Sequence, residues 1–247
     1  MKQLYIVKTG TTFPATLEQY GDFDQWTRDA LGATDIPVSL IDVKRMGSLP
    51  AVADCAGVVV TGSHAMVTDD LEWSLRIEAW LPELIAAEVP FFGICYGHQL
   101  LARALGGQVD YHPRGKEIGT VAVRCLPAGD EDPLFRNLPE EFPAHVTHSQ
   151  SVLRLPDQAV LLAENTFEPH HAFRFGPCAW GVQFHPEYDS AIMRSYITEQ
   201  AAELVEAGRK VPELLATVRE TPMAAELFRG FARYVATRLE EASFPSL

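Results

Sequence analysis

Residues 93–102 read Gly-Ile-Cys-Tyr-Gly-His-Gln-Leu-Leu-Ala (GICYGHQLLA), and this stretch decides how the centre of the chain folds. The apolar run that ends at Cys95 (VPFFGIC, 89–95) predicts a buried strand, and the residues after Gly97 have the apolar spacing of a helix. A turn of the form G-x-C-x-G between strand and helix is sharp and strained, so its neighbours must be small. We therefore expect Cys95 on such a turn, with Gly93 and Gly97 beside it.

Cys95 has the position of a nucleophile at this turn. A helix N-terminus carries a partial positive charge that favours the thiolate, and nearby backbone N–H groups can hold a developing oxyanion. The alternative is a buried structural cysteine on an ordinary turn between strand and helix, because cysteine is often buried. The flanking glycines favour the first interpretation without deciding it.

Short apolar runs alternate with helical patterns around this turn. Strands are predicted at 4–7 (LYIV), 37–43 (PVSLIDV) and 57–61 (GVVVT), and a helix at 70–87 precedes the strand of Cys95. GVVVT lacks polar alternation, so helices should cover both of its faces, as in a parallel sheet. We expect an α/β fold with a doubly wound, mostly parallel sheet flanked by helices.

The second half of the chain has a different pattern. The alternating run 120–125 (TVAVRC) predicts antiparallel strands at the sheet edge, and 179–184 (AWGVQF) predicts a late strand. Thr221-Pro222 is a typical helix start, followed by apolar residues that share one helical face: Met223, Leu227, Phe231, Tyr234, Val235 and Leu239. We predict a domain at 1–198 and a C-terminal helical extension at 199–247 that packs on it; a partner-binding helix is the alternative.

Composition limits the possible partners and cofactors. The net charge of −13 would repel phosphate backbones and anionic membranes, so we expect no nucleic-acid or membrane partner. The four cysteines form no CxxC pair and lie beside no histidine cluster with zinc spacing, so we expect no metal, no cofactor and no disulfide. The chain begins with no secretion signal and has no apolar run long enough to cross a membrane, which predicts a soluble cytoplasmic protein.

A thiolate hydrolase needs a base and a group that orients the base. His185 and Glu187 are candidates because they follow the strand 179–184 two residues apart and can face the same way. The carboxyl end of a strand in an open α/β sheet is where sites form, and Cys95 lies at the same kind of edge. The alternative for His185 is a structural or solvent-exposed histidine.

The motifs GICYGHQLLARALGG (93–107) and GVQFHPEY (181–188), in this order, resemble the class I (triad-type) glutamine amidotransferases, as in the glutaminase part of GMP synthase. The similarity spans most of residues 1–198 and implies a flavodoxin-like sheet. It also implies that Cys95 is the nucleophile, His185 the general base and acid, and Glu187 the group that orients His185. The reaction would be attack on the glutamine side-chain amide, release of ammonia and hydrolysis of a γ-glutamyl thioester.

The resemblance implies further site residues. The family's glycine-rich loop after the third strand corresponds to 61–64 (TGSH), so the oxyanion donors would be the N–H of Gly62 or Ser63 and that of Tyr96. Gln99 would line the substrate pocket. The backbone of 148–151 (HSQS), with His148, Ser149 and Gln150, would hold the amino-acid end of the substrate; the alternative is a surface turn. The remaining interpretations are structural or exposed roles for His64, His98, His170 and His171, and packing roles for Cys55, Cys125 and Cys178.

Three functions remain open at this point. The chain has no G-x-x-x-x-G-K-[ST] loop and no G-x-G-x-x-G motif, so a separate synthetase would accept the ammonia, or the chain would act alone. The first hypothesis is glutamine hydrolysis by an amidotransferase. The second is hydrolysis of γ-glutamyl compounds related to glutathione, as in stand-alone γ-glutamyl peptidases. The third is a non-enzymatic regulatory or binding module, which an intact triad disfavours.

Overall fold

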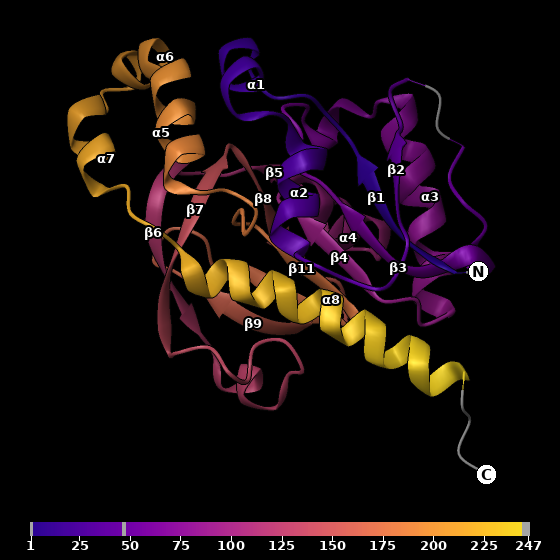
Figure 1. The fold of residues 1–247 in the computed structure, drawn as a ribbon. Coiled ribbons are helices and arrows are strands. Elements are labelled where there is room, and N and C mark those ends of the chain that lie inside the picture. Colours follow the sequence, from indigo (N-terminus) through magenta and orange to yellow (C-terminus); the bar gives the residue numbers. More distant parts are fainter. Residues whose placement is uncertain (1, 46–47, 244–247) are drawn as a thin grey trace.

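The structure is a computed structural model that describes residues 2–45 and 48–243. Within these residues the main sheet has the strand order β2-β1-β3-β4-β11-β10-β9-β6-β7 (Figure 1). A small second sheet pairs β5 with β8. The strand bounds are β1 (Gln3–Lys8), β2 (Val38–Asp42), β3 (Cys55–Val60), β4 (Phe91–Ile94), β5 (Gln108–Tyr111), β6 (Glu117–Cys125), β7 (Glu141–His148), β8 (Gln150–Arg154), β9 (Val160–Glu164), β10 (Ala172–Phe175) and β11 (Ala179–Val182).

The main sheet is mixed. Strands β2, β1, β3, β4 and β11 pair in parallel, whereas β11, β10, β9, β6 and β7 pair antiparallel. The predicted α/β fold, with antiparallel strands added at one edge, is therefore confirmed. The late strand ends at Val182, two residues before its predicted end at Phe184.

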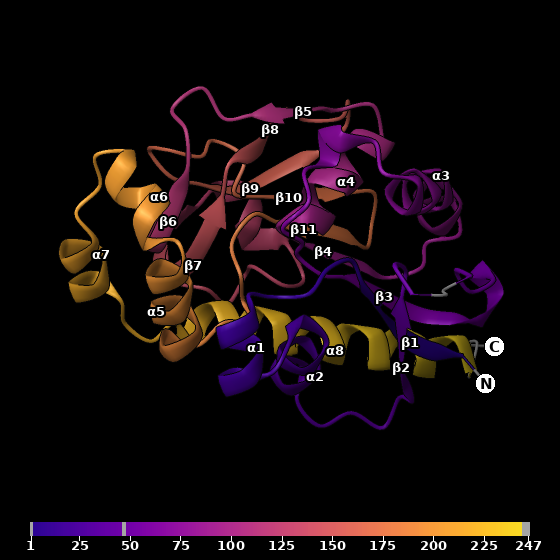
Figure 2. The same ribbon diagram turned by 90° about the horizontal axis from the view of Figure 1, so that it is seen from above.

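Helices cover both faces of the sheet. Their bounds are α1 (Pro14–Tyr20), α2 (Phe23–Leu31), α3 (Glu72–Ala86), α4 (Tyr96–Ala104), α5 (Ser190–Glu199), α6 (Ala201–Glu206), α7 (Val211–Thr217) and α8 (Pro222–Ser243). Figure 2 shows α2 and α8 on one side of the sheet and α3 and α4 on the other. The short helices α5, α6 and α7 lie beside β6 and β7, where α5 contributes to a smaller core with Phe23 and Trp26.

Helix α8 begins at Pro222, as the sequence predicts, and packs on the sheet. All six residues of its predicted apolar face lie in or against the core cluster that contains Phe92 and Trp180. Whether 1–198 and 199–247 are separate units stays a prediction; Met1 and residues 244–247 lie outside the described residues. No helix in the described part of the chain is long and apolar enough to cross a membrane.

Candidate active site

Cys95 lies on a strained turn between β4 and α4. Its φ of +48° and ψ of −94° belong to a region that side-chain-bearing residues rarely adopt. A Cβ on Gly93 would come within 2.4 Å of the Gly97 carbonyl oxygen, and one on Gly97 would come within 2.4 Å of the Val60 carbonyl oxygen. The two glycines therefore give the turn its room, as the sequence predicts. The Cys95 N–H donates to the Val182 carbonyl at 2.8 Å, which fixes the turn on the adjacent strand.

His185 and Glu187 form a buried pair at the end of β11. Glu187 Oε1 lies 2.8 Å from His185 Nδ1, and the side chains are 0% and 2% exposed, respectively. The His185 backbone N–H donates to the His145 carbonyl at 2.8 Å, so a bridge to β7 holds the histidine beyond the end of its strand. Burial alone would lower the pKa of His185, but the negative charges of Glu187 and Cys95 outweigh it and raise this pKa to about 10.

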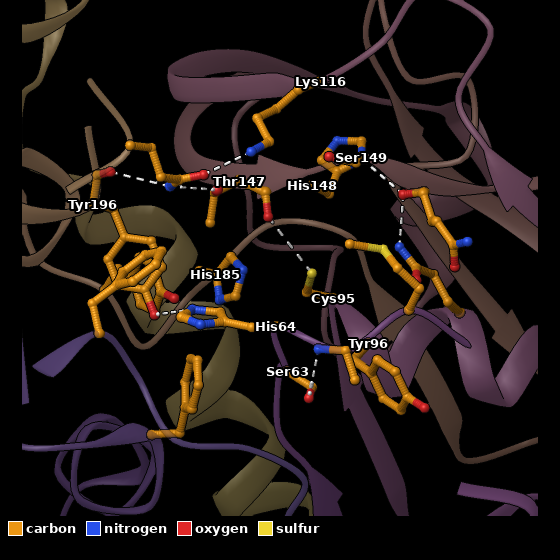
Figure 3. A pocket seen from close by; sticks show the side chains of 18 of the residues that line it. Ser63, His64, Cys95, Tyr96, Lys116, Thr147, His148, Ser149, His185 and Tyr196 are labelled. Atoms are coloured by element: carbon orange, nitrogen blue, oxygen red, sulfur yellow. Dashed lines mark hydrogen bonds between the residues drawn. The ribbon is translucent and has the colours of Figure 1, made fainter. Parts of the chain in front are cut away.

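The surroundings of the His185 ring include contacts that the sequence did not indicate. Tyr188 stacks on it with ring centroids 4.1 Å apart, and a Cβ on Gly62 would come within 2.9 Å of His185 Cε1. Gly62 therefore leaves space for the ring to approach Cys95. The free ring nitrogen, Nε2, is buried without a hydrogen-bond partner among the described residues. Figure 3 shows this ring beside the Cys95 sulfur, which lies 3.9 Å from the Thr147 carbonyl oxygen.

Cys95 and His185 face a common pocket of about 400 Å³. The predicted residues Ser63, Tyr96, Gln99, His148, Ser149 and Gln150 also line it. Gly62 is buried next to the pocket, against His185. The structure thus brings the predicted site residues to one place, from the loop after β3, the turn after β4, helix α4, strands β7 and β8 and the segment after β11. It also brings in an aromatic group that the sequence did not assign to the site: Phe13, Phe23, His64, Tyr188 and Tyr196.

The loop after β3 is fixed by threonine contacts. The Gly62 carbonyl accepts from Thr9 Oγ1 at 2.8 Å and from Thr61 Oγ1 at 3.0 Å. Because a trans peptide places N–H opposite C=O, the Ser63 N–H points away from Thr9. Which of Gly62 and Ser63 supplies the first oxyanion donor stays a prediction.

Gln99, His148 and Gln150 have side chains that build the wall of the pocket. Gln99 Nε2 donates to the Gln150 carbonyl at 2.7 Å and to Gln183 Oε1 at 3.0 Å. The Gln150 side chain accepts from the Val67 N–H at 3.0 Å, which fixes the loop after β3. These contacts hold the 148–150 segment in a defined position, which differs from the surface turn considered as its alternative.

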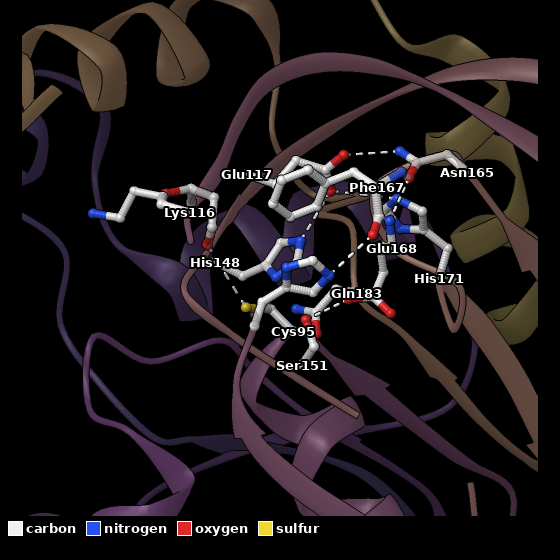
Figure 4. Close-up of polar contacts among 12 residues, drawn as sticks. Cys95, Lys116, Glu117, His148, Ser151, Asn165, Phe167, Glu168, His171 and Gln183 are labelled. Atoms are coloured by element: carbon white, nitrogen blue, oxygen red, sulfur yellow. Dashed lines mark hydrogen bonds and ion pairs between the residues drawn. The ribbon is translucent and has the colours of Figure 1, made fainter. Parts of the chain in front are cut away.

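A buried polar network lies behind this wall (Figure 4). Glu117 Oε2 lies 3.0 Å from His148 Nε2 and 3.5 Å from His171 Nε2, and Glu117 Oε1 accepts from Asn165 Nδ2 at 2.9 Å. Burial alone would raise the pKa of Glu117, but hydrogen bonds from the two histidines hold it well below its usual range. The other His148 nitrogen lies 3.0 Å from the Gln150 carbonyl, so the network supports the pocket wall.

The other three cysteines lie outside the pocket. Burial raises the pKa of Cys55, Cys125 and Cys178 to about 11, so their thiols stay protonated at neutral pH. All four cysteines are free thiols. Within residues 2–45 and 48–243, no group of three or more His, Cys, Asp or Glu side chains is arranged to hold a metal ion.

Cys95 on its strained turn and the His185–Glu187 pair thus lie at the carboxyl edge of the parallel strands, where open α/β sheets place their sites. The model of the family "Glutamine amidotransferase class-I" matches residues 16–204. The chain therefore belongs to the class I glutamine amidotransferase family, and the resemblance stated from its motifs is confirmed.

Several curated relatives resemble the chain over most of its length. A GMP synthase [glutamine-hydrolyzing] from Aeropyrum pernix is 32% identical over 193 residues, which cover 78% of this chain and 35% of that protein. A gamma-glutamyl-L-1-hydroxyisopropylamide hydrolase from a Pseudomonas species is 29% identical over 184 residues, covering 72% of this chain and 61% of that protein. The chain thus spans about a third of the Aeropyrum protein and three fifths of the Pseudomonas one.

Solved structures share the fold. A glutamine amidotransferase from Thermotoga maritima superposes with a TM-score of 0.75 at 22% identity, covering 95% of this chain and 98% of that one. A glutamine amidotransferase from Methylobacillus flagellatus gives 0.72 at 24% identity, covering 97% and 95%. These matches confirm the predicted fold class.

Proposed function

We propose that the chain hydrolyses γ-glutamyl amide bonds, with Cys95 as nucleophile, His185 as general base and acid, and Glu187 as the group that orients His185. The observation that carries the proposal is the strained Cys95 turn facing a pocket that it shares with His185, whose Nδ1 pairs with the buried Glu187. No step of the proposed reaction requires a cofactor or a metal.

In the proposed reaction, the Cys95 thiolate attacks the side-chain amide carbon and forms a C–S bond. The resulting oxyanion is held by the N–H group of Gly62 or Ser63 and by that of Tyr96. The His185 imidazolium then gives its proton to the leaving nitrogen as the C–N bond breaks, which releases ammonia or an amine. A water molecule next gives a proton to His185 and attacks the thioester, and breaking of the C–S bond releases glutamate and restores the thiolate.

The leaving group distinguishes the two enzymatic hypotheses. A pocket that closed beyond the amide nitrogen would favour glutamine, whereas a pocket that continues would favour a substituted amide. Here the pocket continues past His185 to Phe13 and His64, which favours substituted γ-glutamyl amides. The named substrate of the Pseudomonas relative is such an amide. The second candidate is release of ammonia from glutamine for a separate synthetase, and the GMP synthase relatives support it.

The test is the release of glutamate from L-glutamine, glutathione and simple γ-glutamyl amides by purified protein. We expect Cys95→Ala to abolish release, His185→Ala nearly to abolish it, and Glu187→Ala to lower it less, since an orienting group commonly contributes less than nucleophile or base. Cys125→Ala is the matched control, because this protonated thiol lies outside the pocket, and it should keep wild-type activity. Full activity of Cys95→Ala would refute the mechanism.

A further inference from the structure

We infer that the aromatic wall beyond His185 is a leaving-group subsite that selects γ-glutamyl amides whose amine carries a compact, uncharged apolar or aromatic substituent. This inference rests on the proposed function and names its substrate class. The wall consists of Phe13, Phe23, His64 and Tyr196, together with Tyr188 below His185.

The proposed chemistry fixes which end of the pocket receives the leaving group. A general acid must reach the leaving nitrogen, so that nitrogen lies beside His185 and its substituent extends past this ring. The opposite end is bounded by Gln99 and the 148–150 segment, whose polar backbone suits the amino-acid end of a glutamyl group. Figure 3 shows His64, His185 and Tyr196 on one side of Cys95, with His148 and Ser149 on another.

The wall is built from separate segments that hold one another in place. The His64 ring lies 4.3 Å from that of Phe13 and 5.7 Å from that of Tyr196, measured between centroids. His64 Nε2 lies 3.1 Å from the Tyr196 hydroxyl, and that hydroxyl lies 2.8 Å from Thr12 Oγ1. Phe23 meets His64 edge-on at 5.9 Å. The rings are therefore fixed before a ligand arrives, which lowers the entropic cost of binding a flat or compact group.

The charges around the wall favour an uncharged substituent. Part of His64 is exposed, but its ring packs against Phe13 and Tyr196. The loss of solvent there and the nearby positive charge of His185 lower the pKa of His64 to about 4, so the ring is neutral at physiological pH. At the rim, Lys116 Nζ and Glu203 Oε1 pair at 2.6 Å, so each already has a partner of opposite charge. A cationic amine or a peptide carboxylate would have to compete with this pair. An apolar substituent gains contact with the rings and disturbs no ion pair.

The experiment compares glutamate release from L-glutamine and from four γ-L-glutamyl substrates: the benzylamide, the n-butylamide, the amide of 1,4-diaminobutane, and glutathione. Benzylamine and ammonia are similarly basic, so the benzylamide and L-glutamine differ in the substituent more than in the chemistry of bond cleavage. We expect kcat/KM for the benzylamide and the butylamide to exceed that for the other three about tenfold or more. Phe13→Ala and His64→Ala should each lower the ratio of benzylamide to glutamine kcat/KM roughly fivefold.

Leu17→Ala is the matched control, because this exposed side chain on α1 lies outside the pocket, and it should leave the ratio unchanged. Thermal melting of each variant shows whether it is folded. If Phe13→Ala fails to fold, His64→Ala still tests the subsite, because it replaces an exposed residue. Preference for glutamine, glutathione or the diaminobutane amide, or ratios unmoved in both variants, would overturn the subsite while leaving the hydrolase proposal intact. No release from any substrate would instead refute the hydrolase proposal and the subsite with it.

Discussion

Replacing Glu117 by glutamine should destabilise the protein, although it only exchanges one carboxylate oxygen for an NH₂ group. The two Glu117 oxygens accept from His148 Nε2 and from Asn165 Nδ2, at 3.0 and 2.9 Å. Asn165 cannot turn its amide, because its Oδ1 already accepts from the Phe167 and Glu168 N–H groups. A glutamine offers one oxygen and one NH₂ group and carries no charge. Its oxygen can keep Asn165, but its NH₂ group can meet His148 only in the tautomer whose Nε2 accepts, so the buried charge-assisted hydrogen bond is lost. We expect a cost of about 2–4 kcal/mol in the free energy of unfolding.

The assay is thermal and urea unfolding at about pH 7, where a loss of this size lowers Tm by roughly 6–12 °C. The matched control is Glu141→Gln, the same change at an exposed position, which should stay within about 0.5 kcal/mol of wild type. Glu117 has a lowered pKa in the folded state, so its stabilisation is present above its unfolded pKa of 4.5 and is lost as the pH falls toward the folded value. The difference between Glu117→Gln and wild type should therefore shrink below pH 4.5.

The same substitution should affect substrate binding more than chemistry. His148 links Glu117 to the Gln150 carbonyl, in the segment that is proposed to hold the glutamyl end. We expect a several-fold rise in KM with a smaller change in kcat, which a general loss of folded protein would not produce. Equal stability of Glu117→Gln and Glu141→Gln at pH 7 would refute this account of the network.

Two further predictions concern His185. Because the pKa of His185 is raised to about 10, kcat/KM should fall as the pH rises through that value. Glu187→Gln removes a negative charge beside His185, so it should move this fall in kcat/KM to lower pH. A pH profile that Glu187→Gln leaves unchanged would contradict the pairing of Glu187 with His185. Gly62→Ala places a Cβ 2.9 Å from His185 Cε1, so kcat should drop about tenfold or more, whereas Gly230→Ala, with 3.7 Å of clearance, should be active. Equal kcat values for the two alanine variants would show that His185 tolerates displacement.

Much of the fold could be predicted from the sequence because its parallel half has uniform strands and clear helix periods. The run GVVVT is buried throughout, with its first four residues in β3, and the apolar face of α8 packs on the core as its spacing predicts. The antiparallel half was less clear. Strand β10 lies between β9 and β11, and Arg174 interrupts its apolar residues, Ala172–Phe175, whereas the equally short β4 belongs to an uninterrupted apolar run.

Short motifs single out candidate site residues in the sequence. Cys95 stands out because its turn restricts its neighbours, and His185 stands out because Glu187 follows it two residues later after a strand. The aromatic wall did not, because Phe13, His64 and Tyr196 are far apart in the sequence and belong to no common motif. Glu117 likewise gave no signal of burial, since its partners His148, Asn165 and His171 come from other segments of the chain.

One strand pairing explains how two distant motifs form one site. Strands β4 and β11 run parallel, with Ile94 opposite Val182, so both motifs leave the sheet at the same edge. The bond from the Cys95 N–H to the Val182 carbonyl then ties the cysteine turn to the strand that leads to His185. The positive φ of Cys95 costs conformational energy that packing must offset, and the buried β4 residues supply that packing. Precision at the site therefore depends on the centre of the sheet, whereas selectivity for the leaving group depends on loops and helices at its rim, which can vary without disturbing Cys95.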